Sequence, residues 1–414
     1  MTRLRLPLVA LAWMLSALPA SAQFFCSPPF LVDVTFAPTL TRWRFCWEMR
    51  PTEGLVINQA WYTDRSGVER KVLHRASLAQ LHVVYHPGRP RFRDLTLGLP
   101  PSVWGMGTLA LNLAGAECSP GVLVEPRVCR VVSDRGYAWK SGGSFQRGQE
   151  VSVWSSSQLG AYNYIVKWTF KDDGSIEPIV GSTGELQVVD SGAQFLPYGQ
   201  RVNPEGAATP LVARSHVHNV YYRLDFDIST DVNNAVERLF AYTPHFGPPA
   251  SPTDACVNWG ECGHSVQPGP FPTELYENDW PFMSWRVYNR GVFNADGRTI
   301  GYELFPLSRD HWDGRIINDE PWSRGDFYVT TFNGCELLAF DNFPPYIPAG
   351  CAGTAQDVLA MVSGQNVNGA DVVLWYVTRF THLPRDEDQP VMPIEYTGFH
   401  MQPRSWRHQT TTLP

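Results

Sequence analysis

The chain has 414 residues and a formal net charge of −7, from 40 acidic and 33 basic residues spread along its length. No basic cluster occurs, so we expect no nucleic-acid partner. Aromatic residues make up 13% of the chain and charged residues only 18%. This composition excludes a disordered protein and indicates a large buried core.

The N-terminus has the features of a secretory signal peptide, residues 1–22. Arg3 and Arg5 precede an apolar run at 6–18, and the small residues at 20–22 provide a cleavage site. The apolar run is too short to span a bilayer, and no later stretch is long and apolar enough to do so. We therefore expect a secreted, extracellular mature chain with no membrane partner.

All eight cysteines follow this segment, as expected for a protein that folds in an oxidising compartment. No Cys-x-x-Cys spacing occurs, which argues against thiolate metal ligands. Many disulfide connectivities are possible. The simplest pairs neighbours along the chain, as Cys26–Cys46, Cys118–Cys129, Cys256–Cys262 and Cys335–Cys351.

Short segments that alternate between polar residues and β-branched or aromatic residues recur along the chain, separated by turn signals such as Asp-Gly and Asn-Gly. Only residues 356–363 have the pattern of a short helix. The sequence therefore predicts an all-β fold, a large antiparallel β-sandwich with few short helices. The predicted strands are Gly54–Thr63, Val151–Ser155, Tyr164–Phe170, Glu185–Val189, His218–Ile228, Met283–Val287, Asp326–Phe332 and Asp371–Val377.

Residues 247–272 are rich in Pro and Gly and contain Cys256 and Cys262. Strand patterns of the same kind continue on both sides, so we interpret this stretch as a long, disulfide-braced loop and not as a linker. No internal repeat is visible. The mature chain, residues 23–414, is therefore predicted to be one large β domain.

His216 and His218 lie two residues apart in a strand-like segment, so their side chains project from the same face. A third imidazole from a distant strand, for which His382 is the candidate, would complete a three-nitrogen site suited to copper or zinc. An isolated His-x-His pair is more often a surface or hydrogen-bonded feature than a metal site. The surrounding sequence is needed to choose between these interpretations.

The C-terminal run 371–395 closely resembles the signature of copper-containing amine oxidases. In that family the histidine at the place of His382 is the third copper ligand, and the segment with His216 and His218 resembles the one that supplies the other two. The resemblance extends, in the family's order, over nearly the whole mature chain and covers the family's catalytic β-sandwich domain. Further matching stretches are 53–56 (Glu-Gly-Leu-Val), 284–287 (Ser-Trp-Arg-Val), 301–304 (Gly-Tyr-Glu-Leu) and 346–350 (Tyr-Ile-Pro-Ala-Gly).

Residues 160–168 resemble the stretch around the family's cofactor tyrosine, and by position Tyr162 is the precursor of topaquinone. In the family, copper and dioxygen oxidise this tyrosine in place. The resulting quinone converts a primary amine into an aldehyde, with release of ammonia and hydrogen peroxide. Tyr85 resembles the tyrosine that hydrogen-bonds the quinone. Without the family context, both residues would be read as ordinary strand aromatics.

Asp225 and Asp227 with the Phe226 carbonyl, and Asp371 with the Val372 carbonyl, resemble the family's calcium site. Such a set of carboxylate and carbonyl oxygens suits a hard cation, although solvated strand aspartates are the alternative. The resemblance also implies a homodimer.

The sequence departs from the family pattern at three places. The usual Asn-Tyr-Asp/Glu triplet is Ala161-Tyr162-Asn163 here, and the stretch between Cys118 and Cys129 is short. The position of the family's catalytic base, an aspartate, falls on Pro100 or a neighbour without a carboxylate. Asp94 lies nearby but at the wrong spacing, so only a shifted loop would bring it to the site.

The sequence therefore predicts a secreted, copper- and topaquinone-dependent primary-amine oxidase that uses a small primary amine and dioxygen. The alternative is a copper-binding family member that has lost or changed this activity. Zinc at the same three histidines is a further possibility.

Overall fold

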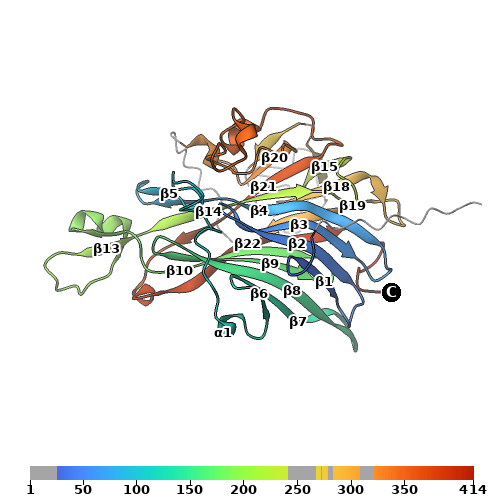
Figure 1. The fold of residues 1–414 in the computed structure, drawn as a ribbon, viewed down its shortest axis with the longest axis horizontal. Helices are drawn as coiled ribbons and strands as arrows, with labels where there is room; N and C mark the ends of the chain where they lie inside the picture. Colours follow the sequence, from blue (N-terminus) through green and yellow to red (C-terminus); the bar gives the residue numbers. More distant parts are fainter. Residues whose placement is uncertain (1–25, 241–266, 272, 278–282, 308–319) are drawn as a thin grey trace, which may run out of the picture.

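The computed structural model describes residues 26–240, 267–271, 273–277, 283–307 and 320–414 (Figure 1). Within these residues, two large antiparallel sheets form most of the molecule. The first sheet has the strand order β1 (Leu31–Thr35), β2 (Arg42–Arg50), β3 (Gly54–Thr63), β4 (Glu69–Tyr85), β14 (His216–Phe226), β21 (Val372–His382), β20 (Phe327–Thr331) and β17 (Leu275–Glu277), with β5 (Arg91–Arg93) paired to β4.

The second sheet lies against the first, and Figure 1 shows β9 and β10 below β14 and β4. Its order is β16 (Gln267–Pro270), β15 (Asn234–Phe240), β18 (Met283–Phe293), β19 (Thr299–Pro306), β22 (Met392–Arg404), β10 (Ile176–Gly184), β9 (Tyr162–Lys171), β8 (Ser144–Leu159), β7 (Val128–Ser141) and β6 (Val122–Glu125).

A small third sheet projects from one end of the molecule, around β13 (Figure 1). It contains β11 (Val189–Ser191), β13 (Leu211–Arg214) and β12 (Gly199–Arg201). The helices of the described part of the chain are short. They are α1 (Gly115–Cys118), α2 (Val358–Met361) and the 3₁₀ turns Ala193–Tyr198, Pro321–Ser323, Ala349–Cys351 and Asp386–Asp388.

The core fills the space between the two large sheets with aromatic side chains from both. Phe45 of β2 stacks on Phe170 of β9 with 4.1 Å between ring centroids. Tyr222 of β14 meets Trp168 of β9 edge-on at 6.1 Å and Phe399 of β22 at 5.0 Å. Each such ring contributes about 1.5–3 kcal/mol through burial of apolar surface. The predicted antiparallel β-sandwich with few short helices is thus confirmed.

The predicted strand Glu185–Val189 is wrong, because only Val189 belongs to a strand. The chain leaves the second sheet at Gly184, where the pairing of β10 with β22 shifts register. Gly184 has φ +113°, and a Cβ there would lie 2.3 Å from the Ala161 carbonyl oxygen. The alternating pattern after Gly184 therefore ends in an irregular segment. The other predicted strands overlap observed ones, and α2 lies within the predicted helix 356–363.

Disulfides join Cys26 to Cys46, Cys118 to Cys129 and Cys335 to Cys351, as predicted. The predicted pair Cys256–Cys262 and the predicted signal peptide lie outside the described residues. Within the described part of the chain, no helix is long and apolar enough to cross a membrane.

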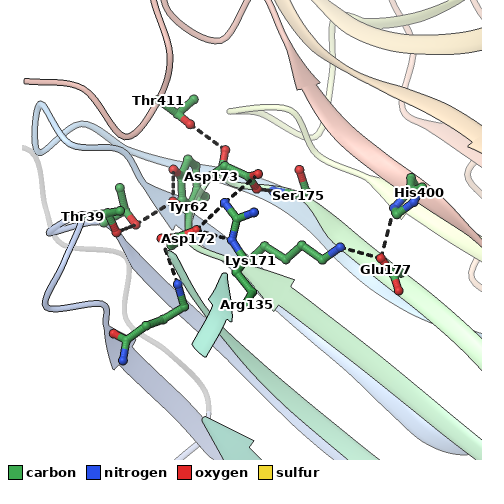
Figure 2. A network of polar contacts seen from close by, with 12 residues as sticks. Thr39, Tyr62, Arg135, Lys171, Asp172, Asp173, Ser175, Glu177, His400 and Thr411 are labelled. Atoms are coloured by element: carbon green, nitrogen blue, oxygen red, sulfur yellow. Dashed lines mark hydrogen bonds and ion pairs between the residues drawn. The ribbon is translucent and has the colours of Figure 1, made fainter. Parts of the chain in front are cut away.

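A network of polar contacts fixes the turn that joins β9 to β10 (Figure 2). The Asp172 side chain is fully buried, and its carboxylate accepts hydrogen bonds from Arg135 Nε at 2.6 Å and the Gln149 amide at 3.1 Å. Its carbonyl accepts from the Tyr62 hydroxyl at 2.8 Å and the Thr41 hydroxyl at 2.7 Å. Since Tyr62 belongs to β3, these contacts tie the two sheets together. They also anchor the end of β9 that lies away from Tyr162.

Candidate metal centre

The three predicted histidines meet on neighbouring strands of the first sheet. β14 runs between β4 and β21, and its register places His216 directly opposite both His382 and Tyr85. His218 follows two residues later on the same face, and both imidazoles of β14 are 1% exposed. Ring centroids lie 4.8 Å apart for His216 and His218 and 4.9 Å apart for His216 and His382.

Neighbouring groups fix which nitrogen of each imidazole faces the others. His216 Nδ1 lies 2.9 Å from the Arg214 carbonyl and must donate to it, which leaves Nε2 with a lone pair. His382 Nε2 likewise donates to Asp388 Oδ2 at 2.9 Å, which leaves Nδ1 with a lone pair. These two acceptor nitrogens lie only 3.4 Å apart. His218 Nε2 is buried without a hydrogen-bond partner.

This donor set fits a copper or zinc ion. The lone pair of His382 Nδ1 faces that of His216 Nε2, and among the described residues the buried Nε2 of His218 has no hydrogen-bond partner. A cation could bind all three nitrogens. The carboxylate of Asp388 behind His382 is the kind of outer partner that orients a metal-binding imidazole. Burial lowers the pKa of His216 to about 3 and also lowers the pKa of His218. Both rings are therefore neutral at physiological pH, as metal ligands must be.

Tyr162 enters this centre from the opposite sheet, at the start of β9. Its hydroxyl lies 2.8 Å from His216 Nε2, and the side chain is 3% exposed. The ring of Tyr85 stacks on His216 from β4, with 4.2 Å between centroids. Burial raises the pKa of Tyr162 well above its usual range. The fold thus places the predicted phenol at the nitrogen where an ion would bind.

Two contacts hold the backbone around Tyr162, although the triplet Ala161-Tyr162-Asn163 departs from the family pattern. Gly184 pairs with Tyr162 across β9 and β10, and its missing side chain allows this close approach. The Gln187 side chain accepts a hydrogen bond from the Ala161 amide at 3.3 Å. A side-chain amide from a neighbouring segment therefore holds the residue where the family pattern has asparagine.

Asp94 reaches the site although its spacing in the sequence did not match. The Tyr164 hydroxyl donates to Asp94 Oδ2 at 2.6 Å, and the Tyr164 ring stacks on Tyr162 with 5.8 Å between centroids. Pro100, at the place of the family's base, is exposed on the surface. The short β5 pairs with β4 and turns the chain inward at Asp94, which supplies the shifted loop.

The predicted calcium residues also come together. Carboxylate oxygens of Asp225, Asp227 and Asp371 lie within 4.8 Å of one another. Asp225 Oδ1 and Asp371 Oδ1 are buried without a hydrogen-bond partner, so the cluster has room for a cation. Burial, followed by the charge of Asp225, raises the pKa of Asp371 to about 7. Asp227 already has cationic neighbours, because it forms an ion pair with Lys71 and lies 3.5 Å from His74.

Sequence reasoning did not single out three residues that support the centre. Asp388 lies within the C-terminal run but was not given a role, although its place six residues after His382 was a signal. Tyr164 has a signal in its spacing, because it follows Tyr162 by two residues on the same strand face. Arg214 acts through its backbone carbonyl, which no sequence pattern reveals.

The copper amine oxidase enzyme domain model matches residues 134–413 of this chain. The chain is 26% identical over 406 residues to a primary amine oxidase of Arthrobacter sp. (strain P1), covering 91% of this chain and 59% of that protein. It is 26% identical over 397 residues to a peroxisomal copper-containing diamine oxidase of Nicotiana tabacum, covering 88% of this chain and 49% of that protein. The chain thus spans about half to three fifths of the length of these curated relatives.

Solved structures show the same fold. A copper-containing benzylamine oxidase from Hansenula polymorpha matches with a TM-score of 0.70 at 20% identity, over 94% of this chain and 64% of that one. An Aspergillus nidulans amine oxidase matches with a TM-score of 0.70 at 19% identity, over 95% of this chain and 56% of that one. Together with the domain match over more than half of its length, this shows that the chain belongs to the copper amine oxidase family.

Proposed function

We propose that this protein is a copper- and topaquinone-dependent oxidase of primary amines. The reaction converts RCH₂NH₂, O₂ and H₂O into RCHO, NH₃ and H₂O₂. The observation that carries the proposal is the meeting of three imidazoles at the hydroxyl of Tyr162. His216 Nε2 lies 2.8 Å from that hydroxyl and 3.4 Å from His382 Nδ1, and among the described residues His218 Nε2 is buried without a hydrogen-bond partner.

His216 Nε2, His218 Nε2 and His382 Nδ1 would hold the copper. The metal would supply one-electron chemistry with dioxygen, and the quinone derived from Tyr162 would take the electron pair from the amine. The remaining contributions come from the chain. Asp388 and the Arg214 carbonyl hold the tautomers of two ligands. Tyr85 packs on the ring of His216, and burial of the site excludes bulk water.

The test of this function is turnover by purified protein loaded with copper in air. We expect hydrogen peroxide and aldehyde release from one or more of methylamine, benzylamine and histamine, and complete block by phenylhydrazine, which reacts with quinone carbonyls. The same protein loaded with zinc is the control and is expected to be inactive. Copper-loaded protein that releases no peroxide from any primary amine and does not react with phenylhydrazine would contradict the proposal.

A second candidate is a copper-binding member of the family that does not deaminate amines. Ala161 favours it, because the family's asparagine is missing beside the tyrosine. In this case the protein would bind one copper ion tightly, with Tyr162 unmodified and no carbonyl reactivity.

Three further properties complete the proposal. The Asp225, Asp227 and Asp371 cluster, with the Phe226 and Val372 carbonyls, is proposed to bind calcium, supported by its two unpartnered carboxylate oxygens. Metal analysis of the purified protein tests this site.

Family membership supports a homodimer, which sedimentation analysis tests. The N-terminal sequence supports secretion, which recovery of the processed chain from the culture medium tests.

A further inference from the structure

We propose that Asp94 is the general base of this site and takes the proton from the carbon next to the amine nitrogen. This inference rests on the proposed amine oxidation, since any such reaction must break a C–H bond at that carbon. The aspartate lies at a position where the family pattern does not place one, and Pro100 stands at the family position.

Asp94 differs from every other buried aspartate among the described residues in having no cationic partner. The others form ion pairs within 4.0 Å with Arg, Lys or His side chains; they are Asp64, Asp172, Asp225, Asp227, Asp326, Asp341 and Asp388. A buried carboxylate without a cationic partner is unfavourable to the folded state. Its contact with Tyr164, whose ring stacks on Tyr162, therefore indicates a chemical role.

The two oxygens of the Asp94 carboxylate have different surroundings. Oδ2 accepts the hydroxyl hydrogen of Tyr164, whose ring is nearly parallel to that of Tyr162, with an angle of 17° between the planes. Among the described residues, none donates to Oδ1. One oxygen is thus held by the phenol next to the reacting ring, and the other is free to accept a proton.

The backbone of Asp94 is fixed on both sides, so the carboxylate has a defined position. Its amide donates to the Leu81 carbonyl of β4 at 2.7 Å, and its carbonyl accepts from Trp104 Nε1 at 2.7 Å. Trp104 opens the turn that follows the exposed Pro100. The loop therefore presents Asp94 to the site and leaves residues 98–100 outside.

The protonation behaviour of Asp94 suits a base near neutral pH. Burial raises its pKa to about 7, and the hydrogen bond from Tyr164 opposes this shift. A base is most effective when its pKa lies close to the working pH. When the C–H bond breaks, Asp94 would take the proton, and the quinone derived from Tyr162 would supply the acceptor for the electron pair. Dioxygen would accept the two electrons with two protons and leave as hydrogen peroxide.

The experiment compares Asp94→Asn with Asp341→Asn in copper-loaded protein. Asp341 is 7% exposed, as is Asp94, but it forms an ion pair with Arg93, which makes it a matched control. We expect Asp94→Asn to keep its copper and quinone content and to lose about 100- to 10,000-fold in kcat. Asp341→Asn is expected to keep kcat. Asp94→Glu should recover part of the loss, with a shifted pH profile.

A second measurement on metal-free protein does not depend on activity. The folded-state pKa of Asp94 lies above the ordinary value of 3.8, so its ionisation destabilises the wild type as pH rises from about 4 through 7. Asp94→Asn should therefore raise the melting temperature relative to wild type at pH 8 and have much less effect at pH 4.5. Asp341→Asn should show no such gain.

The outcomes separate this inference from the proposed function. If the wild type forms no quinone, the proposed function fails and the assignment of Asp94 fails with it. If the wild type turns over and Asp94→Asn retains kcat within a few fold, Asp94 alone is overturned. Equal changes in melting temperature at both pH values would also overturn it, because the carboxylate would then be compensated by the fold.

Discussion

Buried phenols and a buried carboxylate lie at each end of strand β9. The two ends differ in whether the buried carboxylate has a cationic partner. At the Lys171 end, Asp172 is ion-paired to Arg135 and its carbonyl receives the Tyr62 hydroxyl (Figure 2). At the Tyr162 end, Asp94 has no cationic partner among the residues that the structure describes. The first end satisfies its polar groups and stabilises the fold, whereas the second leaves them available for chemistry.

The histidines show the same contrast. His400, near the Lys171 end, lies 3.2 Å from Glu177, whose carboxylate also accepts from Lys171 (Figure 2). Among the described residues, His216 and His218 form no ion pair with a carboxylate, and they lie against each other and His382. Neutral imidazoles gathered in a buried cluster are costly unless a cation joins them. The comparison therefore favours a metal site here on physical grounds alone.

The largest expected effect comes from replacing the phenols at the two ends of β9 by phenylalanine, one at a time. Tyr162→Phe should abolish quinone formation and amine turnover completely, since the ring can no longer be oxidised from a phenol. Tyr62→Phe removes the hydrogen bond to Asp172 and should cost only about 1 kcal/mol of unfolding free energy. Phenylhydrazine labelling and thermal unfolding check both variants. Labelling of Tyr162→Phe would contradict the assignment of the cofactor residue.

Breaking the ion pair at the structural end comes next. Arg135→Met keeps the apolar stem but leaves the Asp172 carboxylate without its cation, and it should cost about 3 kcal/mol of unfolding free energy. Copper affinity per folded molecule should stay unchanged. Denaturant titration measures the effect, with Arg147→Met, whose ion pair with Asp134 is exposed, as the nearly neutral control. Equal stability of the two variants would show that burial does not distinguish these pairs.

A smaller effect on copper affinity is expected from Asp388, which accepts a hydrogen bond from His382. Asp388→Asn removes the carboxylate that holds the tautomer of His382, and copper affinity should fall about 10- to 100-fold. Asp386→Asn is the control, because Asp386 lies on the same 3₁₀ turn but is exposed. Competition with a copper chelator measures both variants. Equal affinities would mean that Asp388 does not orient His382.

The smallest effect concerns Glu177. Its pKa is lowered to about 2, first by the hydrogen bond from His400 and then by that from Lys171, against the opposing effect of burial. A lowered folded-state pKa stabilises the protein above the ordinary pKa of 4.5, and this contribution disappears as pH falls towards 2. Glu177→Gln should therefore lower the melting temperature slightly at pH 7 and not at pH 2. A loss of the same size at both values would contradict this account.

The sequence predicted that the three histidines meet, because the signals for this are local. His216 and His218 share a strand face by their spacing, and the run around His382 carries a long motif. Pairing of β14 with β21 then requires only that both segments be strands in one sheet. The role of Tyr162 was predicted only from the resemblance of residues 160–168 to the family motif.

The sequence could not predict the position of Asp94 or the end of the strand at Gly184, and the reasons are physical. The route of the chain after β5 depends on the backbone contacts of Asp94 with Leu81 and Trp104, which no spacing encodes. The residues after Gly184 alternate like a strand, but the close packing of Gly184 against Ala161 ends the pairing. In both places tertiary contacts override a local pattern.

The central claim is that the three imidazoles bind copper and that this copper converts Tyr162 in place. Its most direct test is the mass of the peptide containing Tyr162, from protein made without copper and then loaded with copper in air. We predict the mass of a quinone at Tyr162 after copper and oxygen, and an unmodified tyrosine without oxygen or with zinc. Unmodified Tyr162 in protein with bound copper and ample oxygen would contradict the claim.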